Sequence, residues 1–166
     1  MRQLLALVIV AVLGLGGGQA SAQELIDKGM VHGWQVMVDP AMGNGCLIQN
    51  VYQDLSVVRL GFDGLEKRGY FTVFHKGWGE IRQGQTYDIT FDLDGQIFDA
   101  VAHGFRHGKV PAAAVFFKDR DFVHAIAAKR VLTVYGQTGA KVMTIDLTGS
   151  AKALEYARKC QDEMGW

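Results

Sequence analysis

The chain has 166 residues, and its 17 lysines and arginines balance 17 aspartates and glutamates. The charges are scattered, with no run of five or more basic residues. Nucleic-acid binding requires a concentrated positive face, so this charge pattern argues against a nucleic-acid partner. A chain of this length can form one domain with a substantial core.

The N-terminus predicts a secretory signal peptide. Arg2 precedes an apolar run from Leu4 to Leu15, and Ala20-Ser21-Ala22 provides a small-residue cleavage site. The alternative is an uncleaved membrane anchor, but a run of about 12 residues is shorter than the ~20 that a spanning helix needs. We therefore predict a signal peptide over residues 1–22 and one mature domain over residues 23–166. The product would be periplasmic or secreted, without a membrane span after cleavage.

The chain contains two cysteines, Cys46 and Cys160. In an exported protein, two cysteines most simply form one disulfide. A predicted helix over about Ser150–Asp162 also favours this reading, because its apolar spacing puts the second cysteine on a buried stripe with Ala153, Tyr156 and Ala157. Two free thiols, or a redox or catalytic cysteine, are the alternatives. Zinc is disfavoured, since no C-x2-C pair is present.

The body of the chain has the period of two that is typical of half-buried strands. The clearest alternation occurs in Ser56–Phe62, Tyr87–Leu93 and Lys141–Leu147. Weaker candidates are Trp34–Val38, Cys46–Val51, Tyr70–Lys76, Gln96–Ala102, Ala113–Lys118 and Val131–Tyr135. Asp63-Gly64 and Asp94-Gly95 are hairpin signals between them.

These elements predict a mainly β fold, either an antiparallel β-sandwich or a partly closed barrel. It would carry one short internal helix over Asp119–Lys129 and one C-terminal helix. Asp119 or Asp121 is available to cap the first helix, and Ser150 the second. A Glu155–Lys159 pair would add a little stability to the second helix.

Two histidines four residues apart, His103 and His107, form a candidate metal contact in the segment HGFRHG. On a strand both side chains lie on one face, where they could contact copper or zinc. No third ligand is visible in the sequence, and the alternative is a solvated strand end.

The loop FHKGWGEIRQG is the best candidate for ligand or partner binding, through His75, Trp78 and Arg82. Tryptophan and arginine dominate binding hot spots, and loops often carry function. The alternative is that the indole folds back onto the core, since large aromatic side chains are usually buried.

No sequence motif for a catalytic nucleophile is present in the mature chain. We therefore assign no catalytic residue, although a histidine-centred hydrolase site assembled by the fold stays an alternative. Nothing in the sequence specifies a cofactor or an oligomeric state.

Several segments resemble a known family, namely GWQVMVD followed by Cys46, then FFKDRDFVHAIAAKRVLTVYG and LTGSAKALEYARKC. Their layout is similar to that of the invasion-associated locus B family of Gram-negative bacteria. Those proteins generally have additional cysteines before the last strand, whereas this chain has none there. The resemblance implies a periplasmic, non-enzymatic β-sandwich.

The sequence as a whole predicts an exported structural or interaction module that is closed by a disulfide. We expect it to bind an envelope protein or a small ligand through its loops. An envelope hydrolase and a weak copper- or zinc-binding protein are the alternatives.

Overall fold

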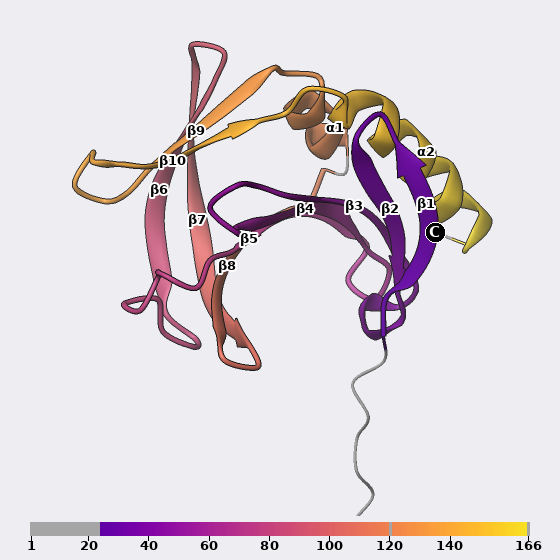
Figure 1. The fold of residues 1–166 in the computed structure, drawn as a ribbon, viewed down its shortest axis with the longest axis horizontal. Coiled ribbons are helices and arrows are strands. Elements are labelled where there is room, and N and C mark those ends of the chain that lie inside the picture. Colours follow the sequence, from indigo (N-terminus) through magenta and orange to yellow (C-terminus); the bar gives the residue numbers. More distant parts are fainter. Residues whose placement is uncertain (1–23, 120, 166) are drawn as a thin grey trace, which may run out of the picture.

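The computed structural model describes residues 24–119 and 121–165, which form one curved antiparallel sheet and two α-helices (Figure 1). The predicted signal peptide lies outside the described residues. The strands are β1 (Ile26–Val31), β2 (Trp34–Asp39), β3 (Gly45–Val51), β4 (Val57–Asp63), β5 (Arg68–Phe74), β6 (Thr86–Leu93), β7 (Gln96–His107), β8 (Val110–Phe117), β9 (Val131–Tyr135) and β10 (Lys141–Asp146). The helices are α1 (Asp121–Ala127) and α2 (Ser150–Glu163), and a short 3-10 helix covers Pro40–Met42.

The strand order is β1-β2-β3-β4-β5-β8-β7-β6-β9-β10, and the paired strands are antiparallel. The predicted fold class is confirmed: the protein is mainly antiparallel β, with one short internal helix and one C-terminal helix. The strands described belong to a single sheet that does not close on itself. Within the described residues, neither helix is long and apolar enough to cross a membrane.

Strand β1 was not predicted, and β7 is longer than predicted. Five of the six β1 residues are exposed, and the register shifts between Asp27 and Gly29, so this strand shows no apolar alternation. Strand β7 continues five residues beyond Ala102, the predicted end, and reaches His107. This extension pairs with β8.

The sheet has two faces of different character. The inner face, which bears Val58, Leu60, Phe71 and Val73, is covered in part by the helices. Helix α2 packs mainly on β2 and β3, and α1 packs on β4 and β5 (Figure 1). The outer face bears the alternating residues, among them Arg59, Tyr70, Thr72 and Phe74.

The predicted disulfide is confirmed. Cys46 in β3 is bonded to Cys160 in α2, and their Cα atoms are 6.1 Å apart. Beside the bridge, the buried Gln161 Oε1 accepts a hydrogen bond of 2.7 Å from the Cys46 amide. The disulfide therefore joins the sheet to the C-terminal helix within the buried core.

Two further hydrogen bonds draw the end of β10 toward β2 and β3. Trp34 Nε1 donates to the Thr148 carbonyl oxygen at 3.0 Å. The Tyr52 hydroxyl donates to the Asp146 carbonyl oxygen at 2.6 Å. Burial raises the pKa of Tyr52, and the Asp146 carboxylate adds to this increase, so the hydroxyl keeps its proton and remains a donor. These contacts close one end of the inner face without strand pairing.

The helix ends differ in part from the sequence prediction. Asp119 caps α1 as predicted, because its Oδ1 accepts from the Asp121 amide at 2.8 Å. The prediction that Ser150 caps α2 was wrong. Gly149 holds the cap position with a positive φ of 84°, and the Ser150 hydroxyl donates to the Ala127 carbonyl oxygen at 2.8 Å.

The predicted Asp94-Gly95 hairpin is confirmed, and the Asp94 carboxylate also binds the backbone at the start of β9. Asp94 and Gly95 have φ values of 53° and 86° at the β6–β7 turn. The Asp94 carboxylate accepts from the amides of Arg130 and Val131 at 2.9 and 3.0 Å. These bonds, the Arg130 one first, lower the pKa of Asp94. The turn thus anchors the start of β9.

Candidate functional site

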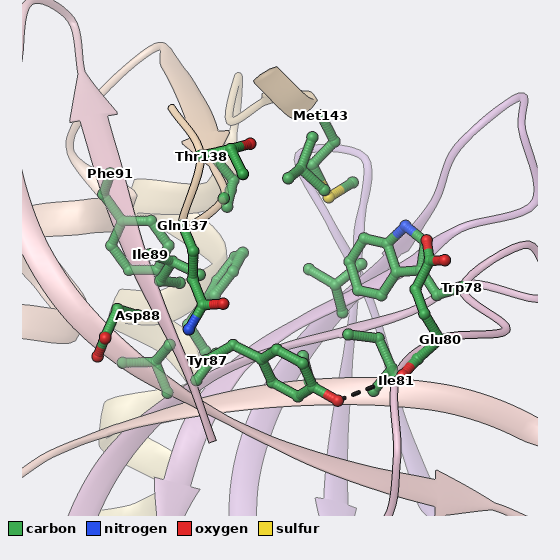
Figure 2. A pocket seen from close by; sticks show the side chains of 18 residues that line it. Trp78, Glu80, Ile81, Tyr87, Asp88, Ile89, Phe91, Gln137, Thr138 and Met143 are labelled. Carbon is green, nitrogen blue, oxygen red and sulfur yellow. Dashed lines mark hydrogen bonds between the residues drawn. The ribbon is translucent and has the colours of Figure 1, made fainter. Parts of the chain in front are cut away.

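A cavity of about 400 Å³ lies on the inner face (Figure 2). Its floor is formed by β5, β8, β7 and β6, its roof by the β9–β10 hairpin, and one side by the loop between β5 and β6. Figure 2 shows Trp78 on the opposite side of the cavity from Ile89 and Phe91. The lining residues are Phe71, Val73, Trp78, Glu80, Ile81, Tyr87, Asp88, Ile89, Phe91, Ala102, Ala113, Val115, Val134, Gly136, Gln137, Thr138, Val142 and Met143.

The lining is mostly apolar, and its charged side chains are both acidic. Glu80 and Asp88 are exposed, as are the polar Gln137 and Thr138. No lysine, arginine or histidine is among the lining residues. Such a cavity accepts an apolar body by burying its surface, and the two carboxylates repel an anion at the entrance.

Tyr87 holds the loop that forms one wall. Its hydroxyl accepts a hydrogen bond of 2.9 Å from the Arg82 amide. The same hydroxyl can donate to the Glu80 carbonyl oxygen at 3.3 Å or to Gln85 Oε1 at 3.1 Å. The loop is thereby tied to the floor of the cavity through a side chain that also lines it.

Gly104 in β7 lets the same loop approach the sheet closely. The Gly104 amide donates to the Gln85 carbonyl oxygen at 2.8 Å, and its own carbonyl oxygen accepts from the Gly84 amide at 2.9 Å. A Cβ atom at this position would collide with the Arg82 carbonyl oxygen. Glycine is therefore required here by the close approach of the backbone.

The structure places the three predicted loop residues in different roles. Trp78 is half-buried, packs against the core and lines the cavity. The His75 ring lies 5.6 Å from the indole, and its Nδ1 accepts from the Gly77 amide at 3.0 Å. The Arg82 side chain is exposed and is not part of the lining.

The two candidate metal ligands lie apart on the outer face. His103 and His107 are four residues apart on an extended strand, so their Cα atoms are about 13 Å apart. The His103 ring is 5.8 Å from Phe116, and the His107 ring is 6.0 Å from Phe74. Over residues 24–119 and 121–165, no group of three or more histidines, cysteines, aspartates or glutamates is arranged to hold a metal ion. The structure therefore does not bring these two histidines together.

A serine, a carboxylate and a histidine come together at Ser56, Asp54 and His75. The Ser56 hydroxyl donates to Asp54 Oδ1 at 2.7 Å, and His75 Nε2 lies 3.8 Å from Asp54 Oδ2. The Ser56 bond is the main cause of a lowered pKa for Asp54. In a catalytic triad the histidine lies between the serine and the carboxylate. Here the carboxylate lies between the other two, so the histidine does not activate the serine.

Comparisons of the chain with models of protein families, with curated proteins and with solved structures found no match. Sequence reasoning selected Trp78 but missed Ile81, Tyr87 and Met143 as lining residues. The alternation that contains Tyr87 was visible, but a cavity wall and a packed core produce the same pattern.

Proposed function

We propose that the mature domain is an exported, non-enzymatic binding protein for a small, largely apolar and uncharged molecule. The observation that carries this proposal is the inner-face cavity of about 400 Å³, whose walls are apolar and whose polar groups are exposed. Its volume falls in the range of about 300–1,000 Å³ that small-molecule sites occupy. Of the two partner types expected from the sequence, the cavity favours a small ligand over an envelope protein.

The charge of the lining supports an uncharged ligand. Glu80 and Asp88 leave an incoming carboxylate or phosphate without a counter-charge. Gln137 and Thr138 can provide hydrogen bonds to a polar but neutral head group. The ligand class is therefore an apolar body with at most one neutral polar end.

Export and family relationship belong to the same proposal. The N-terminal sequence has the order of a signal peptide, and the disulfide fits an oxidising compartment. The resemblance to the invasion-associated locus B family points to the periplasm. Detection of the chain in an osmotic-shock fraction, cleaved after Ala22, is the expected result, and an uncleaved cytoplasmic chain would contradict it.

The test of binding uses N-phenyl-1-naphthylamine, a neutral apolar dye that fluoresces when it leaves water. We expect saturable fluorescence with one dye molecule per chain. Ala113→Phe adds a ring inside the cavity and should abolish the signal. Ala114→Phe is the matched control, because the neighbouring residue points to the other face and lines a different hollow.

Two results would contradict the proposal: no saturable signal with the native protein, or equal signals with the native protein and Ala113→Phe. A competition experiment tests the charge preference. Dodecanol should displace the dye, whereas dodecanoate should displace it less effectively because of Glu80 and Asp88. Equal displacement by both compounds would remove the argument for an uncharged ligand.

A further inference from the structure

The outer face of the sheet has a second hollow, a groove of about 750 Å³. A row of side chains crosses it on four neighbouring strands. Arg59 in β4 is paired with Thr72 in β5, Thr72 with Ala114 in β8, and Ala114 with His103 in β7. Adjacent strands are about 4.8 Å apart, so this row is about 14 Å long. It has a guanidinium at one end and an imidazole at the other, with the Thr72 side chain and the Ala114 methyl group between them.

Aromatic side chains flank the row on both sides. Tyr70 and Phe116 are paired on one side. Phe74 and Phe105 stand on the other, with ring centroids 5.7 Å apart in an edge-to-face arrangement. Because Ala114 is small, the floor between these two aromatic rows is open. The groove is therefore shaped for a flat apolar body lying along the row.

Arg59 is half-buried without a carboxylate to balance it. Its Nε donates to Gln49 Oε1 at 2.8 Å, and its guanidinium carbon lies 4.7 Å from the centre of the Phe74 ring. Among the described residues no carboxylate oxygen lies within 4 Å of the guanidinium. Burial lowers the pKa of Arg59, and the neighbouring Tyr70 and the Asp39 carboxylate oppose this shift only in part. An anion at the two terminal nitrogens would offset this cost of burial.

Two hydroxyl groups stand beside the guanidinium. Tyr70 and Thr72 are buried residues that line the groove, and Thr72 is the cross-strand neighbour of Arg59. Burial raises the pKa of Tyr70, so its hydroxyl stays protonated and can donate. The groove is therefore lined by three kinds of donor, namely the Arg59 guanidinium, the Tyr70 phenol and the Thr72 alcohol.

We propose that this groove binds a small molecule with one carboxylate and a flat apolar body. The carboxylate accepts from Arg59 and from the adjacent hydroxyls, and the body lies over Ala114 between the aromatic rows. Glu24 and Asp39 line part of the groove and disfavour a second negative charge. This site lies on the opposite side of the sheet from the cavity and does not depend on the function proposed for it.

The probe is 2-naphthoate, with 2-naphthamide as its uncharged match, and binding is measured by calorimetry. The carboxylate should bind at least about tenfold more tightly than the amide, as a charge-assisted hydrogen bond predicts. Arg59→Gln should remove this difference, and Arg59→Lys should retain part of it. Near-ultraviolet circular dichroism verifies that both variants fold.

The two neighbouring alanines separate this site from the cavity. Ala114→Phe should abolish naphthoate binding and leave the neutral dye bound, whereas Ala113→Phe should do the reverse. Equal affinity for naphthoate and naphthamide would overturn the proposal, as would an undiminished affinity in folded Arg59→Gln. No detectable binding of naphthoate at millimolar concentration would also overturn it. Tighter binding of 2-naphthyl phosphate would overturn the carboxylate assignment.

Discussion

The two faces of the sheet are built from alternate residues of the same strands, yet only the outer hollow is lined by basic side chains as well as acidic ones. On the inner face, Phe71 and Val73 belong to an apolar cavity whose charged side chains are acidic. On the outer face, Thr72 belongs to a groove that contains Arg59 and two histidines as well as Glu24 and Asp39. One residue of register separates the two environments, so single substitutions can alter one face and leave the other intact.

The largest expected effect comes from removing the disulfide, which supports the inner face. The Cys46→Ser/Cys160→Ser variant opens a loop of 114 residues and should lose roughly 4–5 kcal/mol of unfolding free energy, by the chain-entropy account. Urea denaturation measures this loss, and reduction of the native protein should reproduce it. Equal midpoints for oxidised and reduced protein would contradict the structural role of the bridge.

A methyl group at Gly104 should damage the inner face only. Gly104→Ala directs a Cβ atom against the Arg82 carbonyl oxygen, so the loop must move, at a cost of about 1–3 kcal/mol. We expect weaker dye binding in the cavity and unchanged naphthoate binding in the groove. Gly79→Ala in the same loop is the control, since its Cβ meets no atom within 4 Å. A loss of naphthoate binding in Gly104→Ala would show that the faces are coupled.

Loss of the Tyr87 hydroxyl should have a smaller effect of the same kind. Tyr87→Phe leaves the ring in the cavity wall but removes the acceptor of the Arg82 amide, at a cost of about 1 kcal/mol. Dye affinity should fall several-fold, and thermal denaturation should show a small decrease in Tm. Tyr156→Phe, on the exposed side of α2, should change neither quantity.

The smallest effect is a loss of stability in acid from exposed carboxylates near β9 and β10. The pKa of Asp94 is lowered chiefly by the Arg130 amide, and that of Asp146 chiefly by Thr148. A carboxyl whose pKa is lower in the folded state stabilises it above the unfolded pKa and loses this contribution as pH falls through the folded pKa. Tm should therefore decrease below about pH 4.

The Asp94→Asn variant tests the origin of this acid sensitivity. It should have a lower Tm at neutral pH and a shallower decrease of Tm on acidification than the native protein. If Tm of the variant fell on acidification as steeply as that of the native protein, other carboxylates would be responsible for the acid sensitivity.

The sequence predicted most elements because alternation and turn chemistry are local properties. Segments such as Tyr87–Leu93 showed clean alternation, and Asp94-Gly95 identified the hairpin that follows. Strand β1 was not predicted because its residues are mostly exposed and Gly29 interrupts its register. The strand order could not be predicted either, because β8 lies between β5 and β7 and no local pattern encodes this pairing.

The candidate sites were less predictable than the fold. Trp78 was selected because tryptophan on a loop is typical of binding hot spots, but its partners in the cavity come from six strands and the β9–β10 turn. The groove depends on the row Arg59–Thr72–Ala114–His103, which exists only once the cross-strand register is known. In sequence, Arg59 is a single polar residue in an ordinary strand.

The β9–β10 hairpin, which covers the inner-face cavity, is attached to the rest of the protein at its base and not at its turn. Strand β9 is joined to β6 over Thr90–Leu93 only, while the far end of β10 is tied to Tyr52 and Trp34 through neighbouring backbone. The turn at residues 136–140 has neither kind of anchor, so its amide hydrogens should exchange with solvent faster than those of β3 to β5. We therefore expect hydrogen exchange at this turn to slow when a molecule occupies the cavity beneath it, while exchange in β3 to β5 stays unchanged.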